Sequence, residues 1–198
     1  MKSLFTDYAQ AELSIESDKE IAISGLLQRI GHTFDSKHRY GVFECFLSRL
    51  LLWRVPGNCG NGSSNTGIVD RSLPSWSWMM HNRIEFFANH WIKILECNIK
   101  FGSGAELLAP IRRLQNCKIE QRGDRHAIQN NDSHEVGELW FDSQASTESR
   151  DCVVVGMYDP DNCLILLLSI YDHCYLRVGA GYIKAGYISK DSWDGIIV

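Results

Sequence analysis

The chain has 198 residues, of which 44% are apolar and 22% charged, proportions typical of a folded globular protein rather than a disordered one. Its formal net charge is −4, and its lysines and arginines are scattered along the sequence, which argues against nucleic acid as a partner. The length fits a single domain, so we expect residues 1–198 to form one unit.

The sequence also indicates where the protein resides. No apolar run reaches the roughly 18 residues that a membrane helix needs, and the longest, residues 163–171, has the length of a strand. Residues 1–10 lack the charged start and apolar stretch of a signal peptide. The seven cysteines form no CxxC pair and no regular spacing, which is typical of reduced thiols. We therefore expect a cytoplasmic protein without membrane contact or disulfides.

Two helices are predicted in the first part of the chain. Residues 18–30 carry apolar side chains at the spacing of one helix face, and Ser17 with Glu20 forms a capping-box pattern ahead of them. A second apolar pattern predicts a helix over residues 40–53. Residues 1–56 should therefore form a helical part.

The remainder of the chain is expected to be rich in strands. Residues 57–72 contain many Gly, Ser and Asn residues and predict a flexible loop. From residue 73 the apolar period changes to two, so residues 73–198 should form the β-rich part. Strands are predicted at 83–87, 91–101, 118–122, 136–141, 152–158, 163–171 and 174–184. Residues 107–114 are ambiguous between a short helix and a loop, and residues 123–134 are expected to be a loop.

One pair of strands has a clear turn signal. Continuous apolar runs flank the sequence Asp159-Pro160-Asp161-Asn162, which predicts a hairpin of two strands covered on both faces. The predicted fold class is therefore α+β, with an N-terminal helical pair packed on a β-rich, curled or barrel-like antiparallel sheet.

The stretch Leu73-Pro74-Ser75-Trp76-Ser77-Trp78 carries two tryptophans at positions i and i+2, which share one face of an extended chain. We predict that both indoles are largely buried, since exposing them would forfeit several kcal/mol. They form either part of the core or the wall of a ligand pocket. In the second case, Trp76, Trp78, Trp91 and Tyr175 are the candidate ligand-binding residues.

Four stretches of the chain resemble a known family. Residues 18–26, Leu50-Leu51-Leu52-Trp53, the PSWSW stretch at 74–78 and Tyr175-Leu176-Arg177-Val178-Gly179 are similar, in that order, to the region that follows the HET domain in fungal heterokaryon-incompatibility proteins. Residues 1–13 contain no tyrosine and tryptophan–glycine pattern of the kind that begins the family's HET domain, which has a TIR-like fold. The resemblance implies a module that stands apart from that domain.

Sequence motifs for metals and cofactors are absent. The seven histidines show neither HExxH nor paired i, i+4 spacing, and no Cys/His set has the spacing of a zinc site. Neither GxGxxG nor GxxxxGK occurs, and the GxSxG pattern of serine hydrolases is missing. We expect no metal and no cofactor.

A candidate catalytic group lies near the C-terminus. In a single strand, Tyr171, His173, Tyr175 and Arg177 would share one face. His173 could then act as acid or base, Tyr171 as a donor and Arg177 as the support of an anionic oxygen. The alternative is a hairpin turn at Asp172-His173, with Arg177 in a structural ion pair.

Two functions remain open from the sequence. The first is a stand-alone HET-C-terminal-like module that binds a small molecule or a protein through an aromatic-lined β surface. The second is a cofactor-independent cyclase or isomerase of fungal secondary metabolism, which would act by holding a small organic substrate in a reactive conformation.

Overall fold

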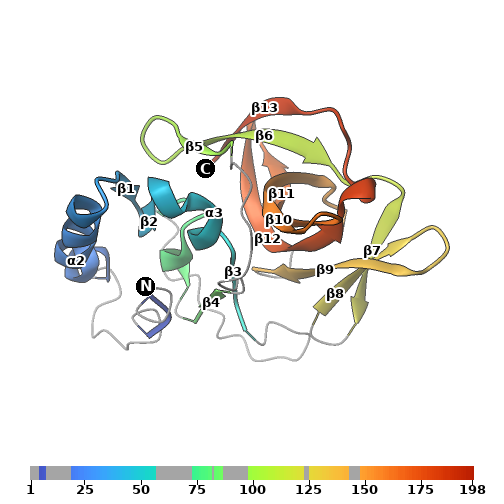
Figure 1. Ribbon diagram of the computed structural model, residues 1–198, viewed down its shortest axis with the longest axis horizontal. Coiled ribbons are helices and arrows are strands. Elements are labelled where there is room, and N and C mark those ends of the chain that lie inside the picture. Colours follow the sequence, from blue (N-terminus) through green and yellow to red (C-terminus); the bar gives the residue numbers. More distant parts are fainter. Residues whose placement is uncertain are drawn as a thin grey trace.

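A computed structural model describes residues 5–7, 19–56, 73–81, 83–86, 98–122, 125–142 and 148–198. The helices of the N-terminal part lie at one end of the molecule, and the strands of the large sheet form the opposite end (Figure 1). Ser17, Trp91, the predicted loop at 57–72 and most of the predicted strand at 91–101 fall outside the described residues.

The first predicted helix is confirmed as α2, Lys19–Thr33, whose Ile23 and Leu27 are buried. The second predicted helix is wrong, because residues 40–53 divide among four short elements: β2 (Val42–Phe43), η2 (Glu44–Phe46), α3 (Leu47–Leu50) and β3 (Trp53–Arg54). No helix in the described ranges is long and apolar enough to cross a membrane.

The interruption of the second helix has a local cause. Tyr40 and Gly41 both have positive φ, 46° and 76°, and they join β1 (His38–Arg39) to β2. Arg39 pairs with Val42, so these two residues form the two-residue loop of a tight hairpin. A right-handed helix cannot pass through two such residues, and the chain turns back on itself.

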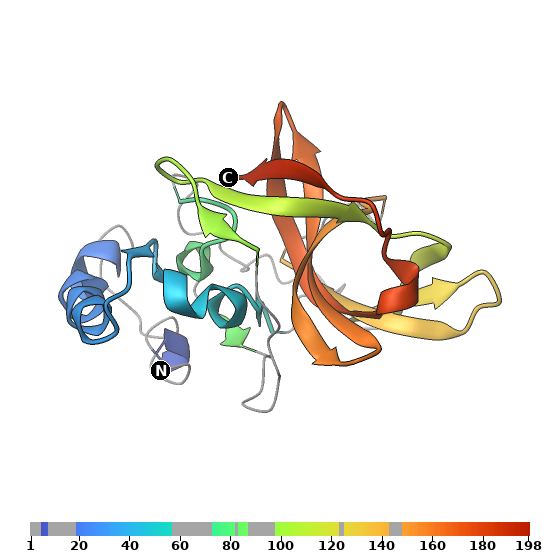
Figure 2. The same ribbon diagram turned by 45° about the horizontal axis from the view of Figure 1, so that its top comes forward.

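Most of the described strands belong to one large, mainly antiparallel sheet with the strand order β11-β10-β6-β13-β12-β9-β8-β7. An additional β11–β12 pairing closes a ring of five strands, and β9, β8 and β7 continue outward from β12 (Figures 1 and 2). The strands are β5 (Lys100–Phe101), β6 (Leu107–Arg113), β7 (Cys117–Arg122), β8 (Arg125–Asn130), β9 (Glu135–Phe141), β10 (Asp151–Asp159), β11 (Asn162–Tyr171), β12 (Cys174–Lys184) and β13 (Trp193–Ile197). A short separate pairing joins β3 to β4 (Glu85–Phe86).

The predicted strands near 118, 136, 152, 163 and 174 are confirmed, together with the turn between β10 and β11. Two expectations were wrong. Residues 107–113 form strand β6 rather than a helix or loop, and residues 125–130 form β8 rather than a loop. β8 pairs with β7 on one side and β9 on the other, so tertiary pairing outweighs its polar composition.

The β10–β11 hairpin is covered on both faces, as predicted. Side chains alternate between two apolar clusters, so Val153 and Leu166 belong to one cluster and Cys152 and Ile165 to the other. The first cluster also contains the helices and tryptophans of the N-terminal part, and it therefore joins that part to the sheet.

Trp76 and Trp78 do not lie on a strand. The chain turns at residues 75–76 and continues into the 3-10 helix η3, Trp78–Met80, so the expectation that the two tryptophans share one face of an extended chain is wrong. The predicted burial is confirmed, because both side chains are 0% exposed. Each indole N–H donates a hydrogen bond of 2.9 Å to a backbone carbonyl. Trp76 donates to Ala105 and Trp78 donates to Gly41. These hydrogen bonds allow the indoles to be buried without an unsatisfied donor.

Candidate functional site

The predicted catalytic residues do not come together. Tyr171 ends β11 and is 61% exposed, and the His173 side chain lies in the following turn, 99% exposed. Tyr171 pairs with Cys174 across this turn, where Asp172 has φ of 53°. The chain reverses at this point, so the shared strand face is wrong and the alternative hairpin turn is confirmed.

Arg177 lies on β12, four residues after His173, and is buried. Its guanidinium pairs with Asp142 through Nε–Oδ2 at 2.9 Å and Nη2–Oδ1 at 3.2 Å. It also donates to the carbonyls of Leu51 at 2.8 Å and Trp53 at 2.5 Å, and it stacks 3.3 Å from the centre of the Trp53 ring. With every side of the group occupied, Arg177 is a structural cation that fixes the N-terminal part to the sheet.

The other predicted ligand-binding residues do not share one site either. Tyr175 is partly buried on β12, and its hydroxyl accepts a hydrogen bond from Trp193 Nε1 at 3.0 Å. Trp76 and Trp78 are fully buried, so they line no open surface, and Trp91 lies outside the described residues.

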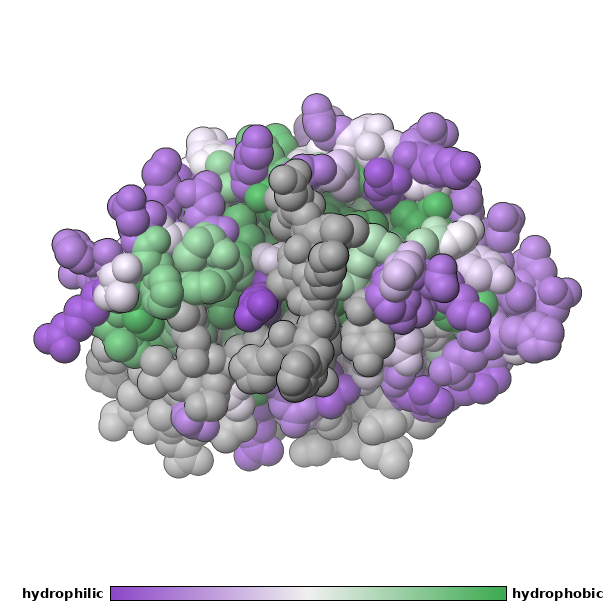
Figure 3. Space-filling model, in the orientation of Figure 1, coloured by the Kyte–Doolittle hydropathy of each residue, from purple (hydrophilic) through white to green (hydrophobic). Residues whose placement is uncertain are grey.

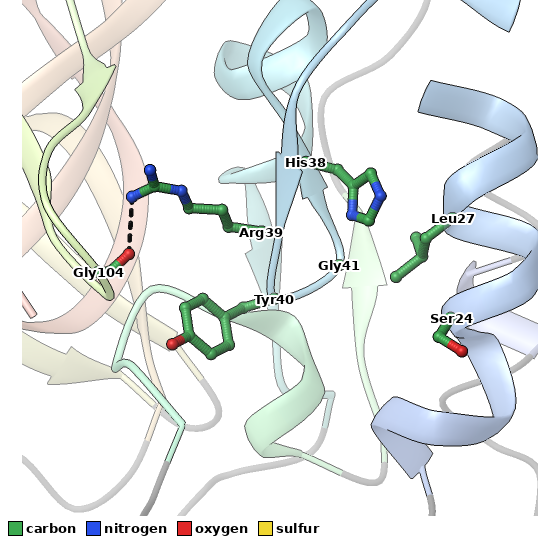
Figure 4. A pocket seen from close by; sticks show the side chains of 7 residues that line it. All are labelled: Ser24, Leu27, His38, Arg39, Tyr40, Gly41 and Gly104. Atoms are coloured by element: carbon green, nitrogen blue, oxygen red, sulfur yellow. Dashed lines mark hydrogen bonds between the residues drawn. The ribbon is translucent and has the colours of Figure 1, made fainter. Parts of the chain in front are cut away.

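A surface hollow with a volume of about 380 Å³ lies beside the Tyr40–Gly41 turn, which Trp78 contacts. It is lined by Ser24, Leu27, His38, Arg39, Tyr40, Gly41 and Gly104. Figure 4 shows α2 with Ser24 and Leu27 on one side, the β1–β2 turn in the middle and the loop of Gly104 on the other side. We refer to this space as the hollow and treat it as the candidate functional site.

The floor of the hollow is the turn Tyr40–Gly41, and the PSWSW stretch holds this turn from behind. Ser77 Oγ donates to the Tyr40 carbonyl at 2.9 Å, and Trp78 Nε1 donates to the Gly41 carbonyl at 2.9 Å. The Tyr40 ring packs edge-on against Trp76 at 5.7 Å between centroids. The tryptophans therefore support the site from beneath rather than forming its wall.

Tyr40 itself has an uncommon backbone conformation. A φ of 46° is rare for a bulky side chain, and positions of this kind in a loop of two residues favour Asn or Gly. Such a conformation persists where the surroundings over-determine it, and it is concentrated at functional sites. The hydrogen bond from Ser77 and the ring contact with Trp76 supply that support here.

Arg39 lies between the turn and the neighbouring loop. Its Nη1 donates to the carbonyls of Gly102 at 2.8 Å and Gly104 at 2.7 Å, the second of which is drawn in Figure 4. Its guanidinium carbon lies 5.3 Å from the centre of the Phe101 ring. These contacts hold the cation in a fixed orientation beside the hollow.

The remaining groups of the lining favour binding over catalysis. Ser24 Oγ donates to its own helix at the carbonyl of Ile21, 2.7 Å away, and the His38 ring packs against Phe43 at 5.4 Å. Among the described residues, no hydrogen bond links Ser24, His38 and Tyr40, so no nucleophile and base are paired. No group of three His, Cys, Asp or Glu side chains in the described part could hold a metal ion.

Apolar side chains also reach the surface in this part of the molecule. Figure 3 shows hydrophobic residues gathered on the face formed by the N-terminal part. Phe34, just beyond α2, is 49% exposed and packs edge-on against Phe46 at 5.1 Å.

Sequence reasoning missed the residues of the hollow. Tyr40 and Gly41 were assigned to a helix, and Ser24, Arg39 and Gly104 lie far apart in the sequence. The available signal was the glycine at position 41 after a polar stretch, which is compatible with a turn. Comparison with known proteins adds no relative, because no family model, no curated protein and no solved structure matches the chain.

Proposed function

We propose that the chain is a binding module that takes a small organic molecule in the hollow. The observation that carries the proposal is the Tyr40–Gly41 turn, which Ser77 and Trp78 hold in an uncommon conformation at the base of a surface cavity. A preformed site binds more tightly than a flexible one, because little ordering is left to occur on binding. The turn contributes Tyr40 and Gly41 to the lining.

The size of the hollow supports a small molecule. Ligand sites commonly have volumes of roughly 300–1,000 Å³, and the hollow has about 380 Å³. Its lining combines Leu27 and the aromatic Tyr40 with polar groups from Ser24, His38 and Arg39, which could orient a ligand. A protein partner is the alternative occupant, and the exposed Phe34 beside α2 is the feature that favours it.

The proposal includes the resemblance to the region that follows the HET domain in fungal proteins. Three of the four similar stretches meet at one residue, since Leu51, Trp53 and Ser75 all bond Arg177 of the fourth. Ser75 Oγ accepts from the Arg177 backbone N–H at 2.9 Å, at the place where β12 changes partner from β13 to β9. A shared structural role explains why these stretches would occur together.

A cyclase or isomerase of fungal secondary metabolism is less well supported. That alternative depends on Tyr171, His173 and Arg177 facing one substrate, whereas two of them lie at an exposed turn and the third is enclosed by protein groups. The described lining of the hollow contains no hydrogen-bonded acid and base that could replace them. Binding is therefore the function that the geometry favours.

We also propose a cytoplasmic location. The five described cysteines, at positions 45, 117, 152, 163 and 174, are free thiols, which suits a reducing compartment.

A fragment screen by NMR tests the proposed function. The ¹⁵N-labelled protein is titrated with a library of neutral and charged fragments, and the amide signals of Gly41 and Gly104 report on the hollow. We expect a subset of fragments to shift both signals and to leave Gly186, which is not part of the lining, unchanged. If no fragment at millimolar concentration shifts Gly41 or Gly104, the proposal is wrong.

A further inference from the structure

On the basis of the proposed function, we infer that the ligand of the hollow carries a carboxylate or phosphate group and that Arg39 binds it. The inference depends on how the guanidinium is already used. Both of its hydrogen bonds come from Nη1, to the carbonyls of Gly102 and Gly104. In the described part of the chain, Nε and Nη2 of Arg39 donate to no acceptor.

The unused Nε–Nη2 edge is suited to a planar or tetrahedral anion. Two parallel N–H groups of a guanidinium match two oxygens of a carboxylate or phosphate, and such pairs are among the strongest hydrogen-bonded contacts. The carbonyl bonds and the Phe101 ring orient Arg39 before any ligand arrives. The cation is thus positioned without being neutralised.

The charge around Arg39 favours the same conclusion. Within the described residues, five arginines have a carboxylate within 4 Å, namely Arg54, Arg113, Arg122, Arg125 and Arg177. Arg39 has none, and the described lining of the hollow contains no Asp or Glu. In a chain with net charge −4, an arginine without a carboxylate beside a cavity creates a local preference for anions.

The ligand must also have an organic part. A phosphate ion alone would occupy only a small share of about 380 Å³, and the remaining space is bounded by Leu27 and the Tyr40–Gly41 turn. We therefore assign the ligand to the small organic anions, with the anionic group at Arg39 and a ring or chain over the turn.

The test measures affinities from the Gly41 and Gly104 amide shifts in a buffer free of phosphate and carboxylate. The probes are benzoate and phenyl phosphate, the neutral analogues benzamide and benzyl alcohol, and inorganic phosphate. The variant R39Q removes the cation. Its matched control is R112Q, because Nη1 of Arg112 also clamps two carbonyls, Ser189 at 2.8 Å and Lys190 at 2.9 Å, away from the hollow.

We expect the aromatic anions to bind at least tenfold more tightly than their neutral analogues, and R39Q but not R112Q to remove this preference. Inorganic phosphate should bind at least tenfold more weakly than phenyl phosphate.

Equal binding of benzamide and benzoate to the wild type would overturn the anion inference but not the proposal that the chain is a binding module. Equal binding of inorganic phosphate would also overturn it, since the organic part would then contribute nothing. Failure of every probe and fragment would overturn the proposed function itself. The wild-type comparison needs no variant, so it decides the inference even if R39Q does not fold.

Discussion

The Arg177 guanidinium and the Asp142 carboxylate meet inside the protein, with Nε 2.9 Å from Oδ2 and Nη2 3.2 Å from Oδ1. Burial raises the pKa of Asp142 and lowers that of Arg177, while the attraction between the two groups opposes both shifts. Because Arg177 also donates to Leu51 and Trp53, the pair lies where the N-terminal part joins the sheet.

We predict that Arg177→Gln lowers the free energy of unfolding by about 3–5 kcal/mol, because it leaves the Asp142 charge buried without a cation. The exposed His173, which sequence reasoning placed in the same group, serves as control. His173→Ala should change stability by about 0.5 kcal/mol or less. Urea denaturation of the two variants gives both values, and equal stability of the two would show that the buried pair does not hold the parts together.

Substitution of glycine by alanine should have opposite effects on stability at Gly41 and Gly25. A Cβ on Gly41 would lie 2.7 Å from Trp78 Nε1, at a φ of +76°, so Gly41→Ala should destabilise the protein by about 1–3 kcal/mol. A Cβ on Gly25 in α2 would meet nothing within 4 Å, so Gly25→Ala should stabilise it by about 0.5–1 kcal/mol. Thermal unfolding of both variants checks the signs. A neutral Gly41→Ala would mean that the turn is not fixed by Trp78.

Trp78→Phe keeps an aromatic ring but removes the N–H that bonds the Gly41 carbonyl. Leaving this buried carbonyl without a donor should cost about 1–3 kcal/mol. Because the turn then loses one of the two hydrogen bonds that hold it, fragment binding in the hollow should weaken as well. The control is Trp193→Phe, at a partly exposed indole outside the lining, which should not alter binding. Calorimetry and NMR titration measure the two effects. Unchanged binding in Trp78→Phe would show that the PSWSW stretch does not support the hollow.

The environment of Tyr182 should make the stability of the protein depend on pH in the alkaline range. Its hydroxyl donates to Glu138 at 3.0 Å, and burial together with this carboxylate raises the pKa of Tyr182 to about 12 from the usual value near 10. The unfolded chain therefore loses this proton first, so the stabilisation is fully present below pH 10 and is lost as the pH rises through 12.

The free energy of unfolding should fall more steeply between pH 10 and pH 12 in the wild type than in Tyr182→Phe. Tyr171→Phe, which alters an exposed tyrosine at the β11–β12 turn, should behave as the wild type. Denaturation in urea at several pH values gives the slopes. Parallel curves for wild type and Tyr182→Phe would contradict the assigned pKa.

Local sequence patterns predicted an element correctly where the local preference and the tertiary structure agree. The apolar spacing of α2 and the turn signal between β10 and β11 are of this kind. The prediction for residues 40–53 failed because two positive-φ residues interrupt an otherwise helical pattern. β8 was missed because pairing with strands on both sides, rather than its own composition, makes it a strand.

The candidate site was less accessible from the sequence than the core. The tryptophans were correctly expected to be buried, but nothing in the spacing of Trp76 and Trp78 reveals that they support a turn more than thirty residues earlier. The alternation of a single strand predicted that Arg177 faces Tyr171 and His173. The hairpin turn after Tyr171 instead separates Arg177 from both residues. Contacts between distant segments decided the first outcome, and a local turn decided the second.

The central claim, that the hollow binds a small organic molecule, is tested most directly by filling it. Ser24 lines the hollow and is exposed, so Ser24→Trp should occupy the space without disturbing the core. Thr33, two and a half turns further along α2, points to the opposite face, and Thr33→Trp is the matched control. For the fragment that shifts Gly41 most in the wild type, the NMR titration should show at least a tenfold loss of affinity in Ser24→Trp and none in Thr33→Trp. Wild-type affinity in a folded Ser24→Trp variant would contradict the account.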